Sequence, residues 1–195
     1  MSPSAAWIYA LMVWLLPPAK AVEIVRIKDA IETEAERDAR YRSIASDLAT
    51  VVYDPTETPV FSGPKGRAQT ATLLLGLTYL ESGWRKDVDT GKGPHARGDR
   101  GRSWCLGQIN IGRRRTQEGW SGPELVRDRP KCLRAVLHAV RQSYNACRRN
   151  HAKNRLAAYT SGDCTAGQPT SAARVSLGQR LFARLPAPPD AAAGP

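Results

Sequence analysis

The stretch that decides the fold is an apolar, helix-forming segment that ends in a carboxylic acid, Thr70-Ala71-Thr72-Leu73-Leu74-Leu75-Gly76-Leu77-Thr78-Tyr79-Leu80-Glu81-Ser82-Gly83-Trp84. Residues three, four and seven positions apart share one face of a helix, so Glu81 continues the stripe of Leu74 and Leu77. Gly83 is a candidate stop for this helix. Apolar neighbours and the negative end of the helix dipole both disfavour a charged carboxylate. The segment therefore predicts a protonatable acid, as general acid catalysis requires, while position alone favours a solvated glutamate.

Helix patterns dominate the rest of the chain, and we predict an all-α or mainly α single domain. Apolar residues spaced by three and four from residue 24 to 52 predict an amphipathic helix that is bent or broken near Asp38. Further helices are predicted from about residue 65 or 68 to 82, and at 130–148, 154–159 and 171–185. Residues 85–103 are polar, rich in glycine and without a period, which predicts a long cleft loop with room for a short β-ribbon.

The N-terminal residues 1–21 have the pattern of a secretory signal peptide, an apolar run followed by Ala19-Lys20-Ala21. The run is shorter than the ~20 apolar residues of a membrane span, so no stable span is expected once the signal is cleaved. Because no Lys or Arg precedes the run, an uncleaved anchor is the alternative. We divide the remaining chain into an N-terminal helix and loop, a main domain, and a disordered Pro/Ala-rich tail, at 22–64, 65–185 and 186–195.

The net charge of +11 suits an anionic partner. Export favours an anionic cell-wall polymer over nucleic acid or a membrane surface. The arginine runs at 113–115 and 148–149 are accompanied by no nucleic-acid motif, so no nucleic-acid partner is expected.

The cysteines predict disulfides, because an even number in an exported chain is typical of paired thiols. The four are Cys105, Cys132, Cys147 and Cys164. Cys132 and Cys147 share one predicted helix and would lie about 22 Å apart, beyond the roughly 7 Å that a disulfide tolerates. We favour Cys105–Cys132 with Cys147–Cys164, which joins neighbours in chain order, and the pairing of Cys105 with Cys147 stays open. Neither cysteines nor histidines have metal-ligand spacing, so we expect no metal and no cofactor.

Three segments resemble, in order, the lysozyme-like lytic transglycosylase domain, the SLT-type group related to goose-type lysozyme. They are Leu80-Glu81-Ser82-Gly83-Trp84, Ser103-Trp104-Cys105-Leu106-Gly107-Gln108-Ile109-Asn110 and Leu156-Ala157-Ala158-Tyr159-Thr160-Ser161-Gly162. The resemblance covers about residues 65–185 and implies a lysozyme-like fold for that domain.

The resemblance implies that Glu81 protonates the glycosidic oxygen between N-acetylmuramic acid (MurNAc) and N-acetylglucosamine (GlcNAc). The same carboxylate would then activate the muramic acid 6-hydroxyl, which closes a 1,6-anhydro ring. This route needs one carboxylate, whereas standard hydrolysis uses a flanking pair. Asp87, Asp89 and Asp99 follow in the predicted loop and could supply the second, although loop solubility and turn formation are the simpler interpretation.

The resemblance also implies roles for residues around the acid. Tyr159 would orient Glu81 by a hydrogen bond, and Gln108 could both donate to and accept from amino-sugar groups. Gly107 replaces the family's usual methionine and Thr160 its usual asparagine, which weakens the expected sugar contacts. The candidate substrate-binding or acid-orienting residues are Ser82, Gly107, Gln108, Ile109, Tyr159 and Thr160. Trp84 and Trp104 flank the candidate site and could stack on sugars or anchor the core.

The sequence thus predicts an exported, periplasmic or extracellular lytic transglycosylase that acts on peptidoglycan glycan strands, with anionic wall polymers as further partners. A hydrolytic muramidase or chitinase is the nearest alternative. The changes at Gly107 and Thr160 also suggest a catalytically inactive, cationic module that binds the cell wall.

Overall fold

A buried helix, α4 (Gly66–Ser82), forms the centre of the structure. In the computed structural model, which describes residues 1–187, every side chain of α4 from Thr70 to Thr78 is buried. Gly83 adopts the left-handed conformation at φ +57° and ends the helix, as its position predicts. Helix α10 (Gln168–Arg184) packs along α4, and a Cβ added at Gly178 would lie 2.9 Å from the Leu73 Cα. Close helix packing around α4 therefore depends on a small residue at this position.

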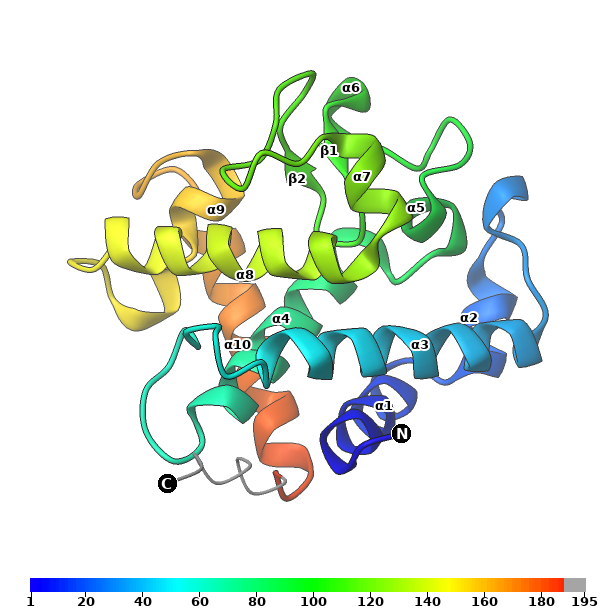
Figure 1. Ribbon diagram of the computed structural model, residues 1–195, viewed down its shortest axis with the longest axis horizontal. Coiled ribbons are helices and arrows are strands. Elements are labelled where there is room, and N and C mark those ends of the chain that lie inside the picture. Colours follow the sequence, from blue (N-terminus) through cyan, green and yellow to red (C-terminus); the bar gives the residue numbers. More distant parts are fainter. Residues whose placement is uncertain (188–195) are drawn as a thin grey trace.

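Two long helices, α3 (Glu34–Val52) and α8 (Arg129–Ala146), run side by side across the front of the view in Figure 1. Helix α3 also contacts α1 (Pro3–Leu15) and α2 (Pro18–Ile24). The buried side of α8 carries the apolar residues that its sequence pattern predicts, Leu133, Val136, Leu137, Val140 and Tyr144. The predicted helices at 130–148 and 171–185 are confirmed within a few residues.

The predicted bend or break near Asp38 is wrong, because the interruption between helices lies earlier in the sequence, before α3 begins at Glu34. Between α2 and α3 the chain forms a short 3₁₀ turn (Lys28–Ala30), and α3 begins with a capping box in which Thr33 and Glu36 bond to each other's backbone. Such a box satisfies the free amides of a helix start. Ile31, one of the apolar residues whose spacing predicts a helix from residue 24 to 52, lies in this connection and is 61% exposed. Asp38 lies inside α3 and accepts hydrogen bonds from Tyr9 and Arg42.

The predicted irregular segment 85–103 and the residues that follow it carry short elements that cover the upper side in Figure 1. They are α5 (Lys86–Thr90), α6 (Gly98–Gly101) and the antiparallel strands β1 (Ser103–Trp104) and β2 (Ile109–Asn110), followed by α7 (Gly122–Arg127). The mainly α fold class is confirmed. The β-ribbon exists, but it begins only where the predicted loop ends.

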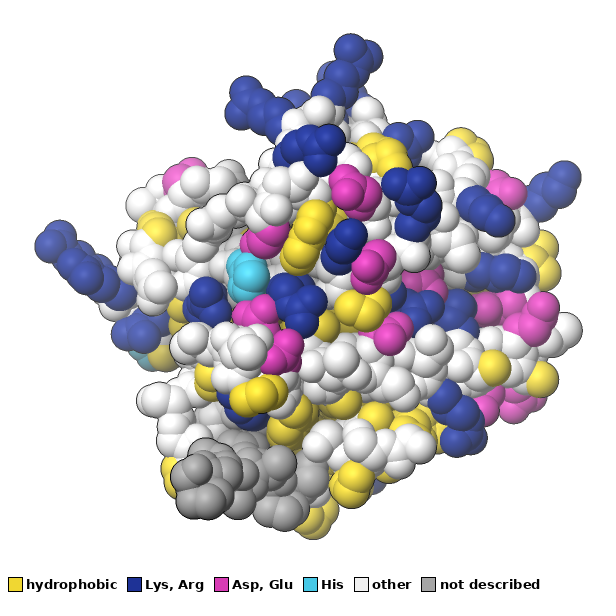
Figure 2. Space-filling model, viewed as in Figure 1, with side chains coloured by type: hydrophobic (Ala, Val, Ile, Leu, Met, Phe, Trp, Pro, Cys, Tyr) yellow, Lys and Arg dark blue, Asp and Glu magenta, His cyan; other side chains and the backbone are white. Residues whose placement is uncertain are grey.

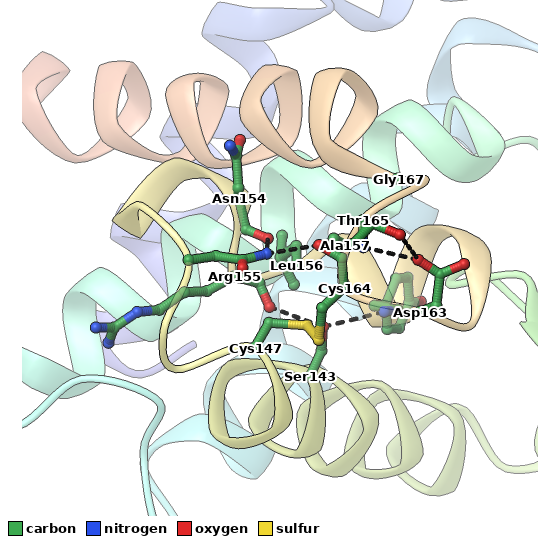
Figure 3. Close-up of a disulfide and its surroundings, with 12 residues drawn as sticks. Ser143, Cys147, Asn154, Arg155, Leu156, Ala157, Asp163, Cys164, Thr165 and Gly167 are labelled. Atoms are coloured by element: carbon green, nitrogen blue, oxygen red, sulfur yellow. Dashed lines mark hydrogen bonds between the residues drawn. A yellow bond between two sulfur atoms is a disulfide. The ribbon is translucent and has the colours of Figure 1, made fainter.

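Two disulfides hold the ends of α8, with the pairing that the sequence analysis favours, Cys105–Cys132 and Cys147–Cys164. Figure 3 shows the second of these beside Ser143, whose hydroxyl donates to the Arg155 carbonyl at 2.8 Å. The same hydroxyl accepts the backbone N–H of Tyr159 at 3.0 Å. These contacts fix the 3₁₀ turn Ala152–Asn154 and α9 (Ala157–Ser161) against α8. The predicted helix at 154–159 is thus present as two short pieces.

The N-terminal segment that the sequence marks as a signal packs on the domain. Ala5, Ile8, Leu11 and Met12 of α1 are buried, and α1 contacts both α3 and α4. Within residues 1–187 no single helix is long and apolar enough to span a membrane. Helices α1 and α2 taken together have the required length and composition, but a bend of 47° separates them. Signal cleavage stays a prediction. The predicted tail lies mostly outside the described residues.

Candidate functional site

A cleft with a volume of about 830 Å³ lies at the end of α4, between α6, the β-ribbon, α8, α9 and α10. Its size is in the range of small-molecule binding sites. Polar side chains dominate its lining, among them Glu81, Asp99, Gln108, Tyr159 and Arg174. The cleft therefore brings together residues from all three segments that resemble the transglycosylase domain, together with Arg174 of α10.

Glu81 lies in the last turn of α4, and its side chain is 18% exposed, at the edge of the cleft. Burial raises the pKa of the Glu81 carboxyl above its ordinary value, because the charged form loses hydration. The guanidinium of Arg174 opposes this rise, and the negative charge of Asp99 adds to it. The raised pKa agrees with the prediction from the helix pattern, and the structure identifies Arg174 and Asp99 as the charged groups that act on the Glu81 carboxyl.

Arg174 forms an ion pair with Glu81 that the sequence analysis missed. Its Nε and Nη2 atoms donate to the same carboxylate oxygen, Glu81 Oε1, at 2.9 and 2.7 Å. A sequence signal was available: Arg174 lies three residues after Ser171 and one before Val175, both buried, on the face of α10 that packs inward. A charged residue beside a buried stripe is a candidate for a partnered charge.

Tyr159 lies near Glu81 but does not donate to it, which corrects the predicted hydrogen bond. Its hydroxyl donates its one proton to the Gly107 carbonyl oxygen at 2.6 Å. The pKa of Tyr159 is raised well above its ordinary value by burial, and the charge of Glu81 adds to the rise. Tyr159 thus stays protonated and holds the loop that forms one wall of the cleft.

Gly107 fits its position because no larger residue has space there. A Cβ at Gly107 would overlap the Val136 side chain and lie 3.2 Å from the Tyr159 hydroxyl. Glycine at this position, where the transglycosylase domains that the sequence resembles have methionine, therefore matches the close approach of α8 and Tyr159.

We expect Gly107→Met to lower the free energy of unfolding by about 1–3 kcal/mol, the usual cost of overpacking. The added side chain must displace Val136 or break the bond between Tyr159 and the Gly107 carbonyl. Thermal unfolding measures the loss, with Gly101→Met as control, because a Cβ at Gly101 meets no atom within 4 Å. Gly101 has a φ of +84°, so the control reports backbone strain without overpacking. Equal losses in the two variants would contradict the packing explanation.

Three other residues that the sequence predicts to contact the substrate form hydrogen bonds within the protein. The Gln108 side chain accepts from the Gly98 N–H at 2.7 Å and donates to the Cys105 carbonyl at 3.1 Å. The Thr160 hydroxyl donates to the Ala157 carbonyl at 2.9 Å. Ser82 is buried and donates to the Thr78 carbonyl at 2.7 Å. All three brace backbone, as loop and helix-end polar residues commonly do. Gln108 and Thr160 also line the cleft, as does Ile109, whereas Ser82 is not among its lining residues.

Asp99 is a second carboxylate in the cleft. Its Oδ2 atom accepts from the Ser103 hydroxyl at 2.5 Å and from the Asn110 side-chain amide at 2.9 Å. The other two aspartates of the segment are elsewhere: Asp87 pairs with Arg85, and Asp89 with Arg129. Loop solubility therefore does not describe Asp87 and Asp89, which are buried, whereas Asp99 is exposed and lines the same cleft as Glu81.

The cleft loop holds several residues in the left-handed region, where side chains other than glycine are strained. Asp99, Arg100, Cys105 and Gln108 have φ values between +49° and +57°. Strained residues grouped beside a cleft are typical of functional segments. No sequence pattern predicts a left-handed conformation at positions that are not glycine.

The two tryptophans next to the candidate motifs do not line the cleft. Trp84 is fully buried, where its indole N–H donates to the Thr78 hydroxyl at 3.0 Å. Trp104 donates to the Gly112 carbonyl at 3.2 Å and carries the Arg97 guanidinium over its ring at 4.6 Å. Both anchor the fold, so the stacking role on sugars is not supported at these positions.

An exposed group of arginines lies near the cleft loop. Figure 2 shows Lys and Arg side chains projecting at the upper edge, over the region of α6 and the β-ribbon. The exposed arginines of this part of the chain are Arg97, Arg100, Arg102, Arg113, Arg114 and Arg115. They concentrate positive charge on the surface near the cleft loop.

His138 contacts two carboxylates through its ring nitrogens. Its Nδ1 lies 2.5 Å from Glu118 and its Nε2 lies 2.9 Å from Glu57. No group of three or more His, Cys, Asp or Glu residues within 1–187 is placed to hold a metal ion.

Comparison of the chain with models of protein families, with curated proteins and with solved structures finds no match.

Proposed function

We propose that this protein is a peptidoglycan lytic transglycosylase with a lysozyme-like domain and with Glu81 as its acid. The observation that carries the proposal is a carboxyl whose pKa is raised by burial, at the end of α4, in a cleft of about 830 Å³. A carboxylic acid with a raised pKa in a cleft is a candidate general acid. The three motif segments, which meet at this cleft, support the family assignment.

In the proposed reaction, Glu81 transfers its proton to the oxygen between MurNAc and GlcNAc as the C1–O bond breaks. The resulting carboxylate takes the proton of the muramic acid 6-hydroxyl, whose oxygen bonds to C1 and closes the 1,6-anhydro ring. Tyr159 and Gly107 hold one wall of the cleft through the bond from the Tyr159 hydroxyl to the Gly107 carbonyl. One carboxylate thus serves as acid and then as base.

Location and partners follow from the disulfides and the charge. Two disulfides indicate an oxidising compartment. We propose that the protein is exported to the bacterial envelope, where the glycan strands of peptidoglycan are its substrate. The exposed arginines near the cleft loop support anionic wall polymers as further partners.

Product analysis tests this function. Purified peptidoglycan is digested with the wild-type protein, and the products are separated and weighed by mass spectrometry. We expect muropeptides with 1,6-anhydro ends, which lack the mass of one water relative to reducing-end products. Reducing-end products alone would contradict the transglycosylase reaction.

Hydrolysis is the second candidate, and Asp99 is the observation that favours it. Its charge contributes to the raised pKa of Glu81, so the two carboxylates are close enough to interact across the cleft. Hydrolytic enzymes use such a pair, in which the second carboxylate activates a water or attacks the sugar.

The two reactions predict different results for Asp99→Asn. For the transglycosylase we expect activity within about tenfold of wild type, because Asn keeps an oxygen that accepts from Ser103 and Asn110 and Glu81 supplies both proton transfers. The rate of release of anhydro products measures this. A loss of about 10² or more, with reducing-end products from the wild type, would instead assign hydrolysis with Asp99 as the second carboxylate.

A further inference from the structure

The ion pair between Glu81 and Arg174 conflicts with the use of Glu81 as an acid. Both side chains line the cleft, and they are 18% and 13% exposed. Two N–H groups of Arg174 point at one oxygen of Glu81, at 2.9 and 2.7 Å. Hydrogen bonds from a guanidinium favour the charged carboxylate. An acid held in this way needs an event that separates it from the arginine before it can donate a proton.

The geometry of Arg174 suits a second carboxylate. A guanidinium presents its donors as a planar fork that matches both oxygens of a carboxylate. Here two donors converge on a single oxygen of Glu81, so the fork is not filled in the way that binds a carboxylate best. Nη1 donates to the Thr170 carbonyl at 3.1 Å, which fixes the arginine along α10 with Nε and Nη2 directed at Glu81 in the cleft.

We propose that Arg174 is the receptor for a carboxylate of the glycan substrate, and that Glu81 occupies the place of that carboxylate in the free protein. This inference rests on the proposed function and specifies its substrate. Muramic acid carries a lactyl carboxylate, which is free where the stem peptide has been removed and is an amide where the peptide is attached. The substrate class is therefore glycan strands with free muramic acid carboxylates.

Exchange of the two carboxylates prepares Glu81 for its reaction. The groups that face Glu81 are Arg174 from α10, Asp99 from α6 and Tyr159 from α9. When the substrate carboxylate binds Arg174, Glu81 loses its cationic partner and gains a further negative charge nearby. Both changes raise the pKa of Glu81, so a proton from solvent binds to it. That proton passes to the glycosidic oxygen as the C1–O bond breaks.

The test compares two forms of one substrate. Peptide-free glycan strands are used as prepared, with free carboxylates, and after conversion of those carboxylates to neutral methylamides. For the wild type we expect kcat/KM on the acid strands to exceed that on the amide strands by roughly tenfold or more, the effect of charge-assisted hydrogen bonds. Calorimetry in two buffers of different ionisation enthalpy should detect proton uptake on binding acid strands and none on binding amide strands.

Variants of α10 assign the effect to Arg174. Arg174→Gln should lose roughly 10- to 100-fold on acid strands, mainly in KM. On amide strands it should show no loss, because the variant frees Glu81 from the ion pair. Because Arg174 lowers the pKa of Glu81, its removal should also shift the alkaline limb of the kcat/KM profile to higher pH. Arg174→Lys keeps the positive charge but lacks the planar fork of donors, so its kcat/KM on acid strands should lie between those of the wild type and Arg174→Gln. Arg180→Gln removes an equal charge from an exposed site on α10 and should behave as wild type.

Equal wild-type affinity and rate on the two strand types would overturn the inference, and so would equal losses on both in Arg174→Gln. If Arg174→Gln does not fold, the wild-type comparison and Arg174→Lys still decide. The proposed function fails separately: binding that prefers acid strands and depends on Arg174, without any cleavage, would contradict catalysis and leave the carboxylate receptor in place.

Discussion

Glu81→Gln is expected to reduce glycan cleavage by about 10²- to 10⁴-fold, the contribution of a general acid, while the fold is retained. Glutamine keeps the shape of the side chain and an oxygen that can accept the two hydrogen bonds of Arg174. It has no proton to give to the glycosidic oxygen and no carboxylate to take one from the 6-hydroxyl. The loss should therefore appear in kcat, because an interaction made only in the transition state is removed.

The measurement is the rate of product release from purified peptidoglycan by the wild type and the variant, with thermal unfolding of both. Glu23→Gln is the matched control, because it makes the same change at an exposed glutamate of α2 that does not line the cleft. We expect wild-type activity for it. Unchanged cleavage by Glu81→Gln would remove Glu81 from the role of acid, and an absence of any cleavage by the wild type would favour the cell-wall-binding module.

The sequence predicts a helix correctly where the helix contains both apolar spacing and a residue that marks its start or its end. Helix α4 combines a buried stripe with a glycine stop, and α8 combines apolar spacing with Pro130 in its first turn. The start of α3 was misplaced because its signal is a capping box, a pair of polar side chains at Thr33 and Glu36, and not a change in apolar spacing. Apolar periodicity alone does not locate such an end.

The site is less predictable, because its partners come from distant parts of the chain. Glu81 could be identified from its own helix, whereas Arg174 is 93 residues away and its pairing is decided by how α10 packs on α4. The loop around Asp99 and Gln108 adopts left-handed conformations without glycine, which no local preference indicates. Sequence therefore identified Glu81 as a candidate acid and left its electrostatic partners undefined.

Removal of the Cys105–Cys132 disulfide is expected to lower the free energy of unfolding by about 3.5 kcal/mol. The chain-entropy relation gives this figure for a sequence separation of 27 residues, because the cross-link restricts the unfolded chain. For a protein of this size the melting temperature should fall by roughly 7–14 °C. The double variant Cys105→Ser/Cys132→Ser is compared with the wild type by thermal and urea unfolding.

The same disulfide should matter for activity, because Cys105 belongs to the strained loop that carries Gly107 and Gln108 and is tied by this bond to α8. The control is Cys147→Ser/Cys164→Ser, whose separation of 17 residues gives a similar loss of about 3 kcal/mol. In that variant α9 keeps the bond from the Tyr159 N–H to Ser143, so the cleft wall stays in place. At a temperature where both variants are folded, we expect a loss of roughly tenfold or more only in the first, because a misplaced cleft loop no longer positions the substrate. Equal activities would mean that both disulfides stabilise the fold alone.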